Sequence, residues 1–160
     1  AEMENALRAP VSLADTASIT ATAATNAGRT NAFPDTSQNT TVTLPTPSAG
    51  LSFRFIYAGA AADATDHIIK TTGNTLFFKG ALTHLDTDGN TNASVFSDGN
   101  SNSILTLATP QSYVIDIVGS SSTVYFISGF VSDHFYDKKI DFTIKIKIFL
   151  RERAGTWNLE

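Results

Sequence analysis

The most regular feature of the sequence is an alternation of apolar and other residues over positions 138–151. Successive side chains of a β-strand point to opposite faces, so this segment would carry one apolar face. An exposed edge strand with such a face would template aggregation. The pattern therefore predicts a long strand whose apolar face is covered, either within its own sheet or by a neighbouring subunit. The predicted assembly interface is Ile140, Phe142, Ile144, Ile146 and Ile148.

Shorter stretches with strand character recur between residues 16 and 131. The clearest is 51–57, where Leu51, Phe53, Phe55 and Tyr57 share one face and are expected in the core. Glycine, asparagine, aspartate, serine and proline separate the stretches, as turns do. The pattern predicts an all-β fold, with the strand spacing that is typical of a sandwich or a barrel. The sequence has no internal repeat at a fixed period, which argues against a solenoid and against a propeller. Expected strands are 18–22, 41–44, 51–57, 67–71, 75–79, 81–85, 103–108, 112–118 and 123–131.

Composition narrows the classes of function. The chain has no cysteine, which excludes disulfides and thiolate metal ligands. Its formal charge of −4 argues against nucleic-acid binding, because phosphate backbones attract basic surfaces. No apolar stretch is long enough to span a bilayer, so no membrane partner is expected. The first ten residues lack the apolar core of a secretory signal, which predicts synthesis in the cytoplasm of the cell that makes it.

The expected domain organisation has three parts. Residues 1–15 form an N-terminal arm that is loosely docked or that orders on a partner; within it, Leu7, Arg8 and Val11 are candidates for docking. Residues 16–151 form the β-domain, and residues 152–160 form a tail. The last part of the β-domain is the added C-terminal strand over 138–151.

The acidic loop that starts at residue 86 is the one candidate cation site. Asp86, Asp88 and Asn90 alternate along it and could offer oxygen ligands to a hard cation. The glycine and glutamate spacing of a calcium-binding helix-loop-helix is missing, and the same residues suit turn geometry. The sequence therefore favours turns, with no metal and no cofactor.

Each histidine lies near an aspartate in the sequence, which raises the question of catalysis. Chemistry of the serine–histidine–aspartate kind would also need an activated nucleophile beside the imidazole. No nucleophile-elbow sequence, paired histidine spacing or phosphate-cradling loop is present. The sequence therefore predicts no enzyme and no small-molecule ligand. The neighbouring pairs are His67 with Asp66, His84 with Asp86, and His134 with Asp133.

Aromatic residues near the end of the chain leave carbohydrate binding open. Exposed rings mark sugar-binding surfaces, but the same rings suit a core or a subunit interface. The candidates are Tyr125, Phe130, Phe135, Tyr136 and Trp157.

Two groups of strands resemble a module of tailed-phage structural proteins. The opening, Thr41-Val42-Thr43-Leu44-Pro45 followed by Ala49-Gly50-Leu51-Ser52-Phe53-Arg54-Phe55-Ile56, is similar to that of head decoration (cement) proteins and tail-associated β-domains. Residues 104–107, 113–118 and 123–129 look like its closing strands, with Val124-Tyr125 where a tryptophan is expected. The resemblance covers residues 16–131.

The resemblance implies a single β-barrel or jelly-roll-like sandwich of short antiparallel strands, which forms a homotrimer without a cofactor. It implies a virion protein on the outer surface of the capsid, bound to the major capsid protein and stabilising the head. A tail-fibre or receptor-binding module that recognises host glycan is the alternative function.

Overall fold

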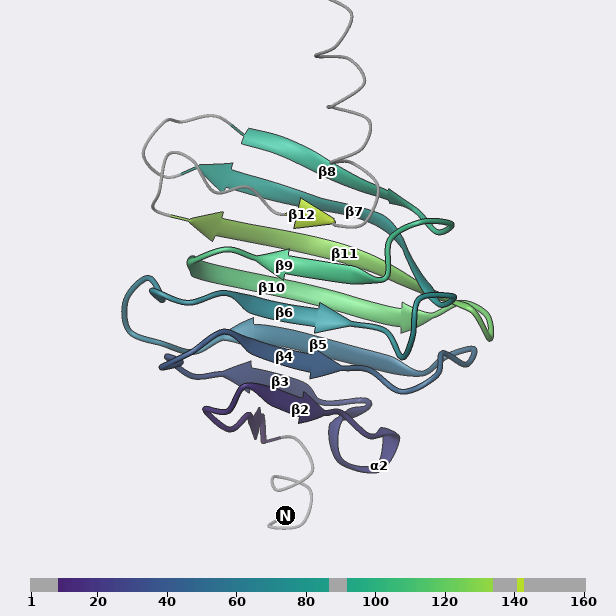
Figure 1. Cartoon of the computed structure of the whole chain (residues 1–160), viewed down its shortest axis with the longest axis horizontal. Helices are drawn as coiled ribbons and strands as arrows, with labels where there is room; N and C mark the ends of the chain where they lie inside the picture. The colour runs from purple at the N-terminus through teal and green to yellow at the C-terminus, as the bar shows by residue number, and fades with distance from the viewer. Residues whose placement is uncertain (1–8, 87–91, 134–140, 143–160) are drawn as a thin grey trace, which may run out of the picture.

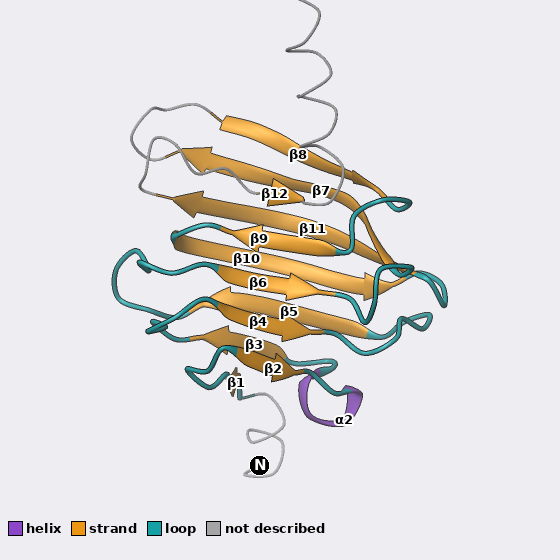
Figure 2. Cartoon of the chain, in the orientation of Figure 1, coloured by secondary structure: helices purple, strands orange, loops and turns teal. Residues whose placement is uncertain are grey.

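Two β-sheets lie face to face as the two layers of the protein (Figure 1, Figure 2). The computed structural model describes residues 9–86, 92–133 and 141–142. One helix, α2 (Ala23–Asn26), interrupts the strands of these ranges, so the prediction of an all-β protein is confirmed. The seven-stranded sheet has the order β1 (Val11–Ser12), β3 (Thr30–Phe33), β5 (Ser52–Tyr57), β10 (Pro110–Gly119), β11 (Val124–Asp133), β7 (Phe77–Asp86) and β8 (Asn92–Asp98). The five-stranded sheet has the order β12 (Asp141–Phe142), β9 (Ile104–Leu107), β6 (His67–Lys70), β4 (Thr40–Thr43) and β2 (Ser18–Thr20).

Both sheets are mixed, which corrects the expectation of purely antiparallel strands. From β1 to β6 the chain alternates between the layers, and each strand runs parallel to the next strand of its own sheet. This half therefore winds like a short solenoid, an architecture that the missing sequence period argued against. Its turns differ in length, so no fixed period results: Val11 lies beside Asn31, Thr30 beside Arg54, Ser18 beside Thr41 and Thr40 beside His67.

The second half of the chain supplies long strands. β10 is antiparallel to both β5 and β11, while β7 is parallel to β11 and antiparallel to β8. β9 is antiparallel to β6 in the other layer. Within the described residues each sheet keeps two separate edges, so neither closes into a barrel.

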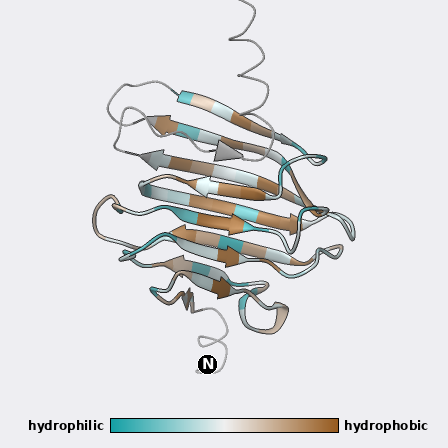
Figure 3. Ribbon diagram, viewed as in Figure 1, coloured by the Kyte–Doolittle hydropathy of each residue, from teal (hydrophilic) through white to brown (hydrophobic). Residues whose placement is uncertain are grey.

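The core lies between the layers and is rich in aromatic rings. Hydrophobic and hydrophilic segments alternate along many of the strands (Figure 3). On β5, Phe53, Phe55 and Tyr57 are buried while Arg54 is exposed, as the alternation predicted. Phe53 meets Tyr125 of β11 edge to face, with ring centroids 6.1 Å apart. Such contacts stabilise aromatic pairs beyond the area they bury.

Gly80 was expected to separate two strands, but β7 runs through it. Its φ is +131°, and a Cβ built there would lie 2.1 Å from the carbonyl oxygen of Ile127 on β11. The glycine thus allows a close approach of two backbones rather than a turn.

Two strands lie where loops were expected. β3 includes Phe33, which precedes Pro34 and falls outside the expected strands, and its ring is fully buried. β8 follows the acidic loop, and most of its side chains are exposed. Neither segment shows a clear apolar alternation of strand length, so neither stood out in the sequence.

The described ends of the chain pack into the fold. Val11 pairs with β3, and Leu13 is buried in the core, so residues 11–13 of the expected arm belong to the sandwich. At the other end, Phe142 of β12 lies beside Leu105 of β9. This pairing places the described part of the expected C-terminal strand at the edge of the five-stranded sheet.

Candidate functional site

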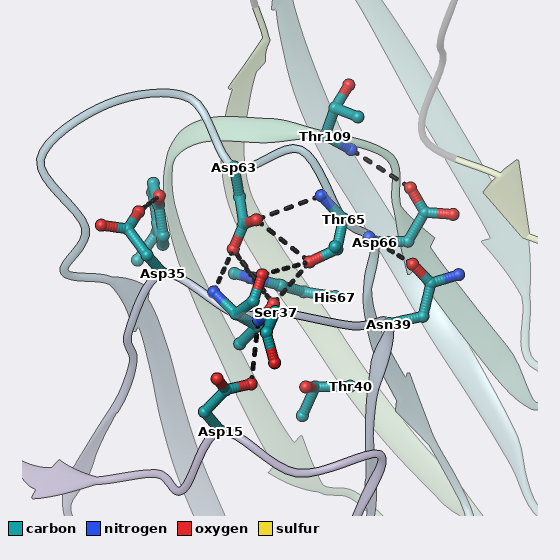
Figure 4. A network of polar contacts seen from close by, with 12 residues as sticks. Asp15, Asp35, Ser37, Asn39, Thr40, Asp63, Thr65, Asp66, His67 and Thr109 are labelled. Carbon is teal, nitrogen blue, oxygen red and sulfur yellow. Dashed lines mark hydrogen bonds and ion pairs between the residues drawn. The ribbon is translucent and has the colours of Figure 1, made fainter.

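A cluster of polar side chains is buried between the layers at one end of the sandwich (Figure 4). His67 is the first residue of β6 and shares the inner face with Ile69, so its ring points between the sheets. Asp63 comes from the β5–β6 connection, Thr36 from the β3–β4 connection and Tyr113 from β10. We call these residues, together with Thr65, the His67 cluster. It joins both layers and two connections.

The imidazole of His67 contacts a partner at each ring nitrogen. Nε2 lies 2.9 Å from Oδ2 of Asp63, and Nδ1 lies 2.8 Å from the hydroxyl oxygen of Tyr113. A neutral ring protonated at Nε2 donates to the carboxylate and accepts from the tyrosine hydroxyl, so it satisfies both contacts. The ring of Phe33 stacks on it with centroids 4.4 Å apart.

The carboxylate of Asp63 is the hub of the cluster. It accepts hydrogen bonds from the Thr36 N–H at 2.8 Å and the Thr36 hydroxyl at 3.1 Å. It also accepts from the Thr65 N–H at 3.1 Å and the Thr65 hydroxyl at 3.0 Å. Because a buried carboxylate is costly without such partners, these contacts fix both connections over the end of the sheets.

Burial sets the protonation states of the cluster. It lowers the pKa of His67, and this effect outweighs the neighbouring carboxylates of Asp63, Asp66 and Asp35, which raise that pKa. Burial would raise the pKa of Asp63, but the hydrogen bonds from Thr36, His67 and Thr65 hold it below its usual value. Burial also raises the pKa of Tyr113 well above its usual value. At neutral pH the cluster therefore consists of a carboxylate, a neutral imidazole and a phenol.

The arrangement orders a carboxylate, an imidazole and a hydroxyl, but all three groups are buried away from solvent. His67 has no exposed surface, and the Tyr113 side chain is buried. Catalysis would require a reacting atom within hydrogen-bond reach of these groups. In this structure the cluster acts as a latch between the layers.

Further polar contacts surround the cluster and hold the same connections. The hydroxyl of Tyr57 is bonded to Asp35 and to the carbonyl oxygen of Ala61. Asp66 accepts a hydrogen bond from the Thr109 N–H at 3.3 Å and so holds the β9–β10 connection. His67 instead bonds to Asp63 of the β5–β6 connection.

The outer face of the seven-stranded sheet is the second candidate. We define the outer apolar face by Phe96, Val114, Val118, Phe126 and Phe130. Among them, Phe96 is 74% exposed, Phe126 48%, Val118 42% and Phe130 37%. Phe126 lies beside Val118, and Phe130 lies beside Val114, across the β10–β11 pair. Exposed apolar side chains that gather on one face are typical of surfaces that bind another protein, a membrane or a ligand.

Charged residues interrupt the outer apolar face. Asp116 lies on β10 between Val114 and Val118 and accepts two hydrogen bonds from Arg54 of β5, at 2.7 and 3.0 Å. Lys79 lies beside Asp98 across the β7–β8 pair. A shallow cleft of about 280 Å³ opens between β3, β5 and β10, lined by Gly28, Arg29, Thr30, Ser52, Phe53, Arg54, Asp116 and Val118.

The predicted site residues are dispersed over the chain. Val11 lies in β1, and its docking role stays a prediction; Leu7 and Arg8 lie outside the described residues. Asp86 is the last residue of β7, while Asp88 and Asn90 lie outside the described residues, so a cation site there stays untested. Of the predicted assembly interface, the structure describes only the backbone of Phe142; the others, Ile140, Ile144, Ile146 and Ile148, lie outside the described residues.

The histidine and aromatic predictions are resolved in part. His67 bonds to Asp63 rather than to its sequence neighbour Asp66. His84 is buried on β7, and His134 lies outside the described residues. Of the candidate sugar contacts, Phe130 is exposed, whereas the Tyr125 ring is fully buried and its hydroxyl donates to the Pro45 carbonyl oxygen.

Sequence reasoning missed Asp63, Thr36 and Tyr113. The signal for His67 was its parity with Ile69 on an expected strand, which places both side chains on the inner face. No comparable pattern marks Asp63 or Thr36, because both lie on connections.

Neither a cluster of metal ligands nor a membrane-spanning helix occurs in the described ranges. These ranges bring together no group of histidine and acidic side chains that could hold a metal ion. They also contain no helix with the length and apolar character of a membrane span.

Comparisons with protein families, curated proteins and solved structures return no match for the chain.

Proposed function

We propose that the chain is a non-enzymatic structural subunit of a phage particle, a decoration protein that works by binding other protein surfaces on the capsid. The observation that carries this proposal is the outer apolar face. Each exposed ring there leaves apolar surface in water, and covering it stabilises a complex by about 25 cal/mol per Å². The polar groups with the potential for acid–base chemistry are instead enclosed in the His67 cluster.

A decoration protein of this kind acts through mass action. A subunit that binds only the assembled shell lowers the free energy of that shell without any chemical step. A rigid sheet suits this work because its side chains are ordered before binding and lose little entropy. The latch formed by the His67 cluster contributes that rigidity at one end of the sandwich.

The architecture and the partners bear on the same proposal. The architecture is a two-layered sandwich of mixed sheets, and the parallel winding of β1 to β6 departs from a jelly roll, whose strands are antiparallel. The partners are further copies of the chain, as a homotrimer, and the major capsid protein. Val11, which begins the described sandwich, is where the docking segment that includes Leu7 and Arg8 joins the domain.

Immunogold labelling tests the proposal. An antibody raised against the recombinant chain is applied to purified particles of the phage that encodes it. Gold over the surface of the head is the expected result. Particles that carry no label, checked by immunoblot of the same preparation, would contradict a role in the virion.

Recognition of host glycan is the second candidate, and Phe126 and Phe130 favour it. Rings on a flat sheet face stack on sugars, and the adjoining Asp116 and Ser128 could accept and donate hydrogen bonds to hydroxyl groups. Labelling over the tail tip together with binding on a glycan array would select this function over head decoration.

A further inference from the structure

We propose that the outer apolar face pairs with the same face of a second copy, through a two-fold axis that runs along the strands between β10 and β11. Phe96 of each copy would then sit in the cleft of the other. This inference rests on the proposed function, because it names the partner that covers the face by which the subunit assembles.

The strand order makes the face complementary to itself under this axis. Rotation about a line between β10 and β11 places β10 over β11, β5 over β7 and β3 over β8. Because Val118 and Phe126 share one row of the sheet, the Phe126 ring of one copy meets Val118 of the other. Phe130 meets Val114 in the same way, so each large side chain opposes a small one. Alternation of large and small side chains is what lets two layers interdigitate.

The same rotation brings the most exposed ring to the cleft. Phe96 lies in the row of Ala81 on β8, and this row continues through Ser128 and Asp116 to Arg54 and Thr30. Since β8 falls over β3, Phe96 of one copy meets Thr30 of the other, which lines the cleft. The cleft of about 280 Å³ is roomy enough for a phenyl ring. Arg54 at its wall can place its guanidinium against the ring as a cation–π pair.

Charge also favours a second copy. The chain carries a formal charge of −4, so two copies repel unless they meet through a balanced surface. This face holds two pairs of one base and one acid, Arg54 with Asp116 and Lys79 with Asp98. Isologous pairing through this axis sets Lys79 over Ser52 rather than over another base.

The area is adequate for a stable pair. Strands about 4.8 Å apart with a rise of about 3.3 Å per residue give β5, β10, β11, β7 and β8 a face of about 700 Å². A pair would bury about 1,400 Å² in total, within the range of specific interfaces. The residues of this contact differ from those of the expected trimer interface at 140–148, so both together would give a hexamer, and this one alone would give a dimer.

Analytical ultracentrifugation of the full chain tests the pairing. The wild-type chain should be an even-numbered oligomer, and Phe96→Asp should raise the dissociation constant at least tenfold. Thr30→Trp, which fills the cleft from the other side, should do the same. Thr43→Asp, on the outer side of the five-stranded sheet, is the matched control and should leave association unchanged. A monomer, a trimer or an oligomer indifferent to both face variants would overturn the inference.

Cross-linking adds a test that does not weaken the face. The chain has no cysteine, so a Ser52→Cys variant and a Lys79→Cys variant each carry a single thiol. When the two are mixed, a short bis-maleimide should join them, because the axis sets these positions against each other. Cross-linking of each variant alone should be much weaker. Equal yields in all three samples would contradict this axis.

The two proposals fail separately. A monomeric chain that labels the phage head would leave the decoration function standing and remove the pairing. A dimer that responds to Phe96→Asp but is absent from the particles would do the reverse. A monomeric chain that binds a glycan from the array would assign the face to sugar and overturn the pairing.

Discussion

The two faces of the seven-stranded sheet hold the same kinds of side chain in opposite surroundings. On β11, Tyr125, Ile127 and Val131 point inward and are buried, whereas Phe126 and Phe130 point outward and are exposed. An acid–base pair also lies on each side of this sheet, Asp63 with His67 between the layers and Asp116 with Arg54 on the outer face. The inner pair is enclosed by further hydrogen bonds, while the outer pair meets water. The comparison indicates that the inner face holds the fold and the outer face is free to bind.

Removing the two acids should give the largest difference between the faces. Asp63→Ala leaves the N–H groups of Thr36 and Thr65 and the ring of His67 without their acceptor, and should lower the free energy of unfolding by about 3–5 kcal/mol. Asp116→Ala removes an exposed ion pair and should cost no more than about 1 kcal/mol. Urea denaturation of both variants measures the difference. Equal losses would show that the inner cluster is not a latch.

A methyl group at Gly80 should have the next largest effect. Gly80→Ala places a Cβ against the Ile127 carbonyl oxygen at an unfavourable φ, and should cost about 2–3 kcal/mol. Gly73→Ala is the matched control, since its φ of +75° is also unfavourable but no atom lies within 4 Å. It should cost about 1 kcal/mol. If the two variants melted together, the close approach of β7 and β11 would contribute nothing.

The pH dependence of stability should come from the inner face. Because burial lowers the pKa of folded His67, the unfolded chain binds its proton first as the pH falls. Its contribution is therefore fully present above about pH 6.5 and is lost as the pH drops toward the lower folded pKa. Asp63, whose folded pKa is also lowered, adds a further loss only below about pH 4. The free energy of unfolding from urea denaturation should fall by no more than about 1.4 kcal/mol per pH unit between pH 7.5 and 5 for this one group.

His67→Gln should flatten that slope in the same pH range. A slope that survives the His67 substitution would assign the pH dependence to other groups.

The all-β class and the core strands could be predicted because apolar alternation is local. Residues 51–57 show this, since their parity alone placed Phe53 and Phe55 in the core. The winding of β1 to β6 could not be predicted, because its unequal turns erase the period that marks a solenoid. β8 was missed because an edge strand with exposed side chains has no buried face to set an apolar pattern.

The candidate site was only half visible in the sequence. The inward position of His67 follows from strand parity, but its partner does not. Asp66 is adjacent to His67 and so points away from it along the strand, while Asp63 reaches it from a connection that folds back. The exposure of Phe126 and Phe130 also depends on whether another segment covers the outer face of the sheet. The sequence alone does not show this.

The central claim is that the inner face of the seven-stranded sheet stabilises the fold and the outer face binds. The variant with the smallest expected change in stability tests it most directly. Phe126→Ser and Ile127→Ser alter neighbouring residues of β11 that face opposite sides of one sheet. Unfolding is measured at a concentration low enough to keep the chain dissociated, since association adds to apparent stability. Self-association is then measured by sedimentation for the folded fraction.

We expect Phe126→Ser to keep the free energy of unfolding within about 0.5 kcal/mol and to lose self-association. Ile127→Ser should cost about 3 kcal/mol or more while the folded molecules still associate. The opposite assignment, with stability lost at Phe126 and association lost at Ile127, would contradict the division of work between the two faces.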